Sequence, residues 1–136
     1  MDYHRLMLEN QTIFSKLVYG HLLPSNLSLG QPKVLEYISE HEGCAQKDIA
    51  INCLIEPASV SSMLSTMEKD GLIGRKPNSD NRRSSIVSLT ELGLEKAGCV
   101  KKTFEEVEKK ALKDFTDEEI QQLLNLLMKV NKNLKG

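Results

Sequence analysis

Apolar residues recur at helical spacing through most of the chain, and breaks in this pattern divide it into six predicted helices. The first covers about residues 2–20, with periodic positions at Tyr3, Leu6, Ile13, Phe14, Leu17 and His21. The second is entered at Ser28 and ended by Gly43, and the third and fourth cover 46–53 and 57–69. The fifth covers about 90–113 and is followed by a last helix, with a broad apolar face.

Residues that start or stop helices support these boundaries. The segment from Ser28 to Gln31 resembles a capping box, and Thr116 with Glu119 forms another at the last helix. Pro57 stands at a favoured first helical position, and Gly71 is the expected left-handed stop of the fourth helix.

Residues 72–93 interrupt the helical pattern. They predict two short strands joined by a polar loop that carries Arg82 and Arg83, with a helix opening directly after. Two short helices separated by a tight turn precede this basic hairpin. The order is typical of a winged helix-turn-helix, so the predicted fold is mainly α with a small β-hairpin wing.

Length and composition indicate one soluble domain of 136 residues. No window is long and apolar enough to span a membrane, and the N-terminus lacks a signal-peptide pattern, so the expected compartment is the cytoplasm. The net charge is only −1, but basic residues gather in the hairpin and acidic ones in the C-terminal third. Because salt screens charges beyond roughly 8–10 Å, nucleic-acid binding depends on local charge and not on the net charge of the chain, and this distribution suits a domain with one DNA-facing side.

The outward face of the fourth helix carries small, mostly hydroxyl-bearing residues, opposite a stripe formed by Val60, Met63, Leu64 and Met67. Small hydroxyl residues let a helix enter the major groove and bond base edges or phosphates, although they also fit a solvated surface. The predicted contacts on this helix are Ala58, Ser59, Ser61, Ser62, Ser65 and Thr66.

Other predicted DNA contacts flank this helix. Gln46 and Lys47 open the third helix, where they either hold a phosphate or are ordinary exposed residues. Arg75, Arg82 and Arg83 belong to the hairpin, and the two arginines of its loop can enter the minor groove. The alternative for that loop is a solvated basic turn.

The terminal helices have apolar faces that a compact winged module between them cannot cover. We expect residues 1–21 and 90–136 to be dimerisation helices around a DNA-binding lobe at 28–89, within a single domain at 1–136. The alternative is that the first and last helices cover the fifth within one chain.

The sequence resembles the MarR family of bacterial and archaeal transcription regulators. Its second-helix entry is similar to residues 27–35, its third helix to 46–50, and its recognition helix and first wing strand to 57–75. The family's pattern D-x-R, five residues and L-T-x-x-G closes here on Leu89-Thr90-Glu91-Leu92-Gly93. Two positions depart from the family: Asn81 replaces the aspartate that pairs with the arginine at Arg83, and Ser62 stands where arginine is frequent.

The resemblance implies a homodimer that binds a pseudo-palindromic operator and represses transcription until a small-molecule effector binds. Half-sites would lie about 10 bp apart. The family often holds its ligand between the dimer helices and the reading head, near Tyr19, His21 and Tyr37 here. The alternative is that these three residues belong to the core or an interface.

No enzymatic or cofactor motif accompanies this pattern. The sequence has no phosphate-binding glycine loop, no H-E-x-x-H and no nucleophile elbow, so neither catalysis nor a cofactor is expected. Cys53 and Cys99 lie on apparently apolar faces, which predicts inert packing, whereas Cys44 follows an acidic segment. His41 and Cys44 lack a histidine on the last two helices to complete a zinc site, so no metal is expected. The remaining alternative is a winged helix that binds a protein instead of DNA.

Overall fold

The computed structural model describes residues 1–25, 27–28, 30–79 and 85–136. They form two compact units, Met1–Phe104 and Glu105–Gly136. In chain order the elements are α1 (Tyr3–Leu22), η1 (Leu23–Ser25), α2 (Gln31–Glu40), β1 (Cys44–Ala45), α3 (Gln46–Cys53), α4 (Pro57–Lys69), β2 (Ile73–Pro77), β3 (Ser85–Leu89), α5 (Glu91–Ala111) and α6 (Asp117–Lys135).

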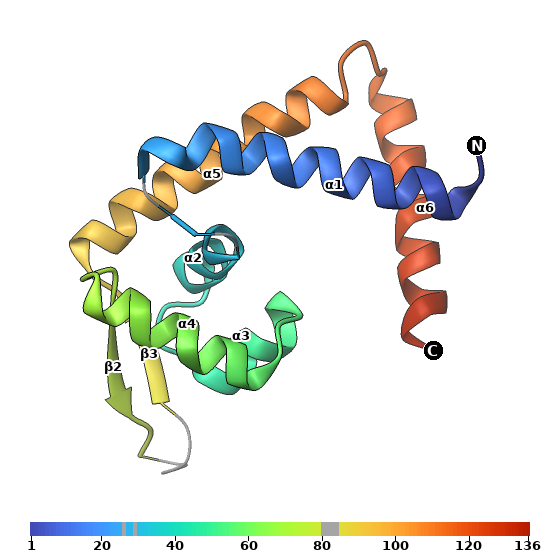
Figure 1. The fold of residues 1–136 in the computed structure, drawn as a ribbon. Helices are drawn as coiled ribbons and strands as arrows, with labels where there is room; N and C mark the ends of the chain where they lie inside the picture. The colour runs from blue at the N-terminus through green and yellow to red at the C-terminus, as the bar shows by residue number, and fades with distance from the viewer. Residues whose placement is uncertain (26, 29, 80–84) are drawn as a thin grey trace. The chain divides into compact units, whose positions relative to one another are not determined.

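The first unit contains a winged helix-turn-helix, which confirms the predicted fold class. Helices α3 and α4 pack together, and the hairpin of β2 and β3 lies beside α4 (Figure 1). Their bounds agree with the prediction, because Pro57 opens α4 and Gly71, at φ 78°, follows its end. The core between these elements is apolar and nearly inaccessible to solvent, and includes Val34, Leu35, Ile38, Ile49, Val60, Leu64, Met67 and Val87.

The sheet has a third strand that the sequence did not predict. The antiparallel order is β1-β3-β2, and the two residues of β1 pair with β3 as Cys44 with Val87 and Ala45 with Ile86. Two residues carry no detectable alternation, so only the partner strand reveals β1. The strand fixes the start of α3 against the wing, because Gln46 follows Ala45 directly.

A close backbone contact joins the end of α4 to the start of α5. The Thr90 hydroxyl donates to the carbonyl oxygen of Gly71 at 2.6 Å and accepts from the Gly93 N–H at 3.0 Å. A Cβ on Gly93 would lie 2.0 Å from the carbonyl oxygen of Leu72. The close approach of the two backbones therefore requires glycine at this position.

The apolar positions of the first helix are covered within the chain only at its C-terminal end. Residues 1–13 are exposed, Phe14 and Leu17 are half-buried, and the buried residues of α1 are Val18 and Leu22. Only the C-terminal turns of α1 bury side chains in the core of the first unit. The periodicity correctly predicted a helix but could not show which part of its apolar face is covered.

The predicted entry to the second helix is also corrected. Helix α2 begins at Gln31, and its N-cap is Gly30 in the left-handed conformation, at φ 94°. Half of the predicted capping box forms, because the Gln31 Oε1 atom accepts from the Ser28 N–H at 3.3 Å. Ser28 lies one turn ahead of the helix and does not cap it.

The second unit contains the last turns of α5 and helix α6. The predicted capping box is confirmed: the Thr116 hydroxyl accepts from the Glu119 N–H at 3.1 Å, and the Glu119 carboxylate accepts from the Thr116 N–H at 3.0 Å. No residue of α6 is buried. Large apolar side chains on this helix are 47–74% exposed, namely Leu124, Leu126, Leu127, Met128 and Leu134.

No helix in the described part of the chain combines the length and the apolar character needed to cross a membrane.

Candidate nucleic-acid interface

Helix α4 presents a continuous polar face over a buried stripe. Val60, Leu64 and Met67 are buried, and all six predicted contact residues on the opposite side are exposed, namely Ala58, Ser59, Ser61, Ser62, Ser65 and Thr66. None of these six side chains extends far from the helix. A helix with this surface can approach the edges of bases closely, as major-groove binding requires.

The hydroxyl groups on this face differ in how they are bonded. The Ser65 hydroxyl donates to the Ser61 carbonyl oxygen at 3.0 Å, and Thr66 donates to the Ser62 carbonyl oxygen at 3.2 Å. Within the described ranges, no side-chain hydrogen bond engages the hydroxyls of Ser59, Ser61 or Ser62. These three hydroxyls therefore keep both donor and acceptor capacity for a ligand.

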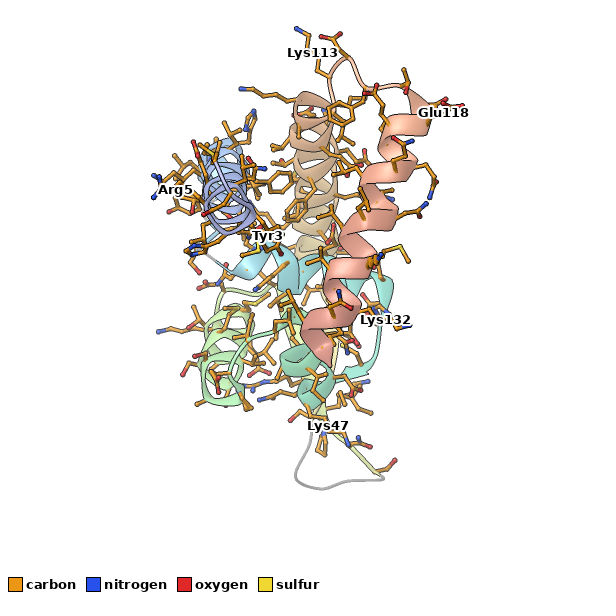
Figure 2. The ribbon with its side chains drawn as sticks, turned by 90° about the vertical axis from the view of Figure 1, so that its right-hand side faces the viewer. Tyr3, Arg5, Lys47, Lys113, Glu118 and Lys132 are labelled. Atoms are coloured by element: carbon orange, nitrogen blue, oxygen red, sulfur yellow. The ribbon has the colours of Figure 1, made fainter. Side chains whose placement is uncertain are left out.

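The first turn of α3 brings two predicted residues to the same region. Lys47 is exposed and lies at the outer end of the first unit, away from α1 (Figure 2). Gln46 is half-buried, and its Oε1 atom faces the Arg75 guanidinium at 3.4 Å. Lys47 is available to a phosphate, whereas Gln46 has a partner within the protein.

Arg75 on β2 turns toward the helices. Its Nη2 atom lies 3.2 Å from the Ser65 Oγ atom and 3.1 Å from the Glu68 Oε1 atom. The side chain of Arg75 is 21% exposed and that of Glu68 is 44% exposed. Sequence reasoning placed Arg75 with the DNA contacts but missed Glu68, its ion-pair partner.

Lys76, the neighbour of Arg75, was also left out of the predicted contacts. It is exposed, and because side chains alternate along a strand it projects from the opposite face of β2. The sequence signal that separates these two cations is Ile73, an apolar residue two positions before Arg75 and therefore on the same face of the strand. Arg82 and Arg83 lie outside the described residues.

The first unit also contains a pocket of about 370 Å³. It lies between the middle of α1, the start of α2 and α5, and is lined by Gln11, Phe14, Ser15, Val18, Tyr19, Gly30, Pro32, Lys33 and Phe104. The rings of Phe14 and Phe104 stack with centroids 6.2 Å apart. The Lys33 ammonium is its cationic group, beside mostly apolar walls and a few hydroxyl and amide groups.

The three residues suggested for an effector site are not brought together. Tyr19 lines the pocket, but His21 and Tyr37 do not. The His21 Nδ1 atom lies 2.7 Å from the carbonyl oxygen of Leu17, one turn back on its own helix. The Tyr37 ring stacks on His41 at 4.3 Å, and its hydroxyl accepts from the Asn52 amide at 3.1 Å.

The cysteines offer no reactive thiolate at Cys44 or Cys53. Burial raises the pKa of Cys44 to about 11, and the charges of Asp48 and Glu42 add to this effect. Burial also raises the pKa of Cys53, which packs in the core as predicted. The prediction of packing for Cys99 is wrong, because this residue is on the exposed side of α5. Among the described residues, no three histidine, cysteine or acidic side chains could hold a metal ion together.

Known proteins resemble the chain in sequence. The model of the MarR family matches residues 27–85. HTH-type transcriptional regulator BilQ of Clostridium symbiosum (strain WAL-14163) is 28% identical over 130 residues, which cover 96% of this chain and 88% of that protein. The organic hydroperoxide resistance transcriptional regulator of Bacillus subtilis (strain 168) is 31% identical over 100 residues, covering 67% and 68% of the two chains.

A solved structure resembles the fold. A MarR family transcriptional regulator from Listeria monocytogenes, crystallised in complex with 26mer DNA, superposes with a TM-score of 0.92 at 28% identity. The match covers 98% of this chain and 89% of that one.

Proposed function

The chain belongs to the MarR family of transcriptional regulators, and from this membership we propose that it represses transcription as a homodimer on a pseudo-palindromic operator. It is a DNA-binding transcriptional regulator. The observation that carries the proposal is the exposed face of small hydroxyl residues on α4, in a fold that a relative crystallised on DNA shares. We propose the cytoplasm as its compartment, and binding without catalysis as its activity.

The proposed contacts divide between groove and backbone. Helix α4 enters the major groove, where the unengaged hydroxyls of Ser59, Ser61 and Ser62 bond base edges. Lys47 holds a phosphate at the start of α3, which fixes the orientation of α4. Arg82 and Arg83 enter the adjacent minor groove from the wing.

Dimerisation is proposed through the terminal helices. The exposed apolar side chains of α6 support it, because soluble monomers rarely leave such faces uncovered. Two-fold symmetry then places the two DNA-binding lobes of the dimer on half-sites about 10 bp apart.

The experiment that tests the proposal is selection of bound duplexes from a random pool, followed by anisotropy titration of the selected duplex at several salt concentrations. We expect an inverted repeat whose affinity falls steeply as salt rises, because neutralising each phosphate releases counterions. Failure of the protein to enrich any duplex at low salt would contradict the proposal and favour a protein-binding winged helix.

Base-reading and backbone-binding residues should respond differently to substitution. We expect Ser61→Ala and Ser62→Ala to change the preferred base at particular operator positions, because they remove hydrogen bonds to base edges. Arg83→Ala should instead weaken all duplexes to a similar degree. Repeating the selection with each variant measures this, and the same uniform loss for all three variants would contradict the assignment.

We further propose that the pocket on the first unit binds an effector, a flat apolar molecule with one carboxylate. Its volume is in the range of small-molecule sites, the stacked phenylalanines form an apolar wall, and Lys33 supplies a cation. The position also suits regulation of DNA binding. The Lys33 carbonyl oxygen accepts from the Cys53 thiol at 3.7 Å, so the segment that lines the pocket contacts α3.

Lys33→Gln is expected to weaken benzoate binding about tenfold, since a hydrogen bond to a charged group contributes about 1.5–3 kcal/mol and partial exposure reduces this. Isothermal titration calorimetry of the two proteins measures the change. Lys16→Gln is the matched control, because Lys16 is an exposed lysine of α1 outside this pocket. Equal benzoate affinity in the wild type and Lys33→Gln would exclude Lys33 as the carboxylate partner.

A further inference from the structure

Arg75 is the residue at which β2, α3 and α4 meet. It is carried by β2 and contacts Gln46 at the start of α3 and Ser65 and Glu68 on α4. We propose that Arg75 is a positioning residue. With Gln46, Ser65 and Glu68 it forms a clamp that fixes the wing (β2 and β3) against helix α4. Arg75 in this role is not a phosphate contact.

The sheet directs Arg75 inward. Arg75 stands opposite Val87 in the register of β2 and β3, and Val87 is fully buried. Residues directly opposite each other project from the same face of a sheet, so Arg75 shares the protein-facing side of the hairpin. Its guanidinium group therefore emerges beside α3 and α4, and Lys76 is the cation of β2 on the outer side.

The hydrogen bonds of the clamp occupy the groups that DNA would need. The Glu68 carboxylate neutralises Arg75 at 3.1 Å, which lowers its attraction for a phosphate. The Ser65 hydroxyl accepts from Arg75 and donates to the Ser61 carbonyl oxygen, so its donor is not available to a base. Two residues predicted from the sequence as DNA contacts, Ser65 and Arg75, thus hold each other instead.

A planar guanidinium group is required for this geometry. Arginine presents its N–H groups as a rigid fork, and here the two terminal nitrogens bond acceptors from separate helices. Lysine would keep the charge, but its three N–H groups share one nitrogen on a flexible stem, so it does not reproduce the two fixed attachment points that Nη1 and Nη2 supply to α3 and α4. The variant Arg75→Lys therefore distinguishes the two possible roles of Arg75, because it breaks the clamp but preserves a positive charge for a phosphate.

Affinity of the full-length protein for the selected duplex, measured against salt, tests the clamp. Arg75→Lys is expected to bind about tenfold more weakly than the wild type, with an unchanged salt dependence. Lys76→Ala removes the charge from the opposite face of the same strand, and Arg75→Lys should lose more affinity than this control although it keeps its charge. Wild-type affinity in Arg75→Lys would overturn the clamp, and so would a decrease of about 1 in the salt slope of Arg75→Ala.

Glu68→Gln tests the clamp without altering Arg75, because the clamp and simple electrostatics predict opposite changes in DNA affinity. The clamp predicts binding about threefold weaker than wild type, because the charge-assisted bond that fixes Arg75 is lost. Simple electrostatics predicts the opposite, since the variant removes a negative charge from a protein that binds a polyanion. Tighter binding of Glu68→Gln would overturn the clamp.

The inference rests on the proposed DNA binding, and the two can fail separately. A wild-type protein that binds no duplex contradicts the proposed function. A wild-type protein that binds an operator, together with an Arg75→Lys variant of equal affinity, contradicts the clamp alone.

Discussion

Gly93→Ala is expected to destabilise the protein by about 4 kcal/mol, a large part of the roughly 5–15 kcal/mol typical of a folded domain. The added Cβ would lie 2.0 Å from the Leu72 carbonyl oxygen and 3.2 Å from the Leu89 side chain. The carbonyl cannot move away cheaply, because it accepts the Thr90 N–H at 3.0 Å and belongs to the segment that leads into β2. Chemical denaturation followed by circular dichroism measures the loss.

Gly98→Ala is the matched control for this prediction. Gly98 belongs to the same helix, and a Cβ there would meet nothing within 4 Å. Alanine is the better helix former by about 1 kcal/mol, so this variant should be slightly more stable than the wild type. A Gly93→Ala variant as stable as Gly98→Ala would show that the contact with Leu72 is not tight in solution.

Leu127→Glu is expected to convert a dimer into a monomer and to reduce operator affinity about a hundredfold or more. Leu127 is 51% exposed in the single chain and shares a face of α6 with Ile120, Leu123 and Leu124. A carboxylate buried at a dimer interface without a partner is strongly unfavourable. Loss of the dimer also removes the gain from binding two linked half-sites.

Light scattering and operator titration measure the two effects. The wild type should have twice the single-chain mass of 15.3 kDa, and Leu127→Glu should have the mass of a single chain. Gln122→Glu introduces the same charge on the polar side of α6 and should leave both mass and affinity unchanged. A dimeric Leu127→Glu protein would contradict dimerisation through this face of α6.

Local signals in the sequence predicted the elements of the DNA-binding lobe well. Helix α4 could be bounded because Pro57 and Gly71 restrict the backbone at its two ends. The wing strands could be predicted because a polar segment separates two short β-forming runs. The exposed face of α4 followed from the positions of Val60, Leu64 and Met67 alone, since the helical period fixes what lies opposite.

Contacts between distant residues could not be predicted in this way. The partners of Arg75 lie 29, 10 and 7 residues away, and no periodicity relates them. The sequence therefore indicated an arginine in a basic hairpin but not its engagement with Glu68. The pocket is a similar case, because Phe14 and Phe104 meet only when α1 and α5 are folded together.

The different bonding of the serines on α4 has a consequence for how such a regulator can diverge. Ser61 and Ser62 are exposed and their hydroxyls are unengaged within the described structure, whereas Ser65 is tied to Arg75. Arginine and glutamine are at least as good as serine in an exposed helix, so exchanging the first two residues carries little penalty for folding. Duplicated copies of this gene could acquire new operators through a few codon changes at these positions, with Ser65 and the core left under purifying selection.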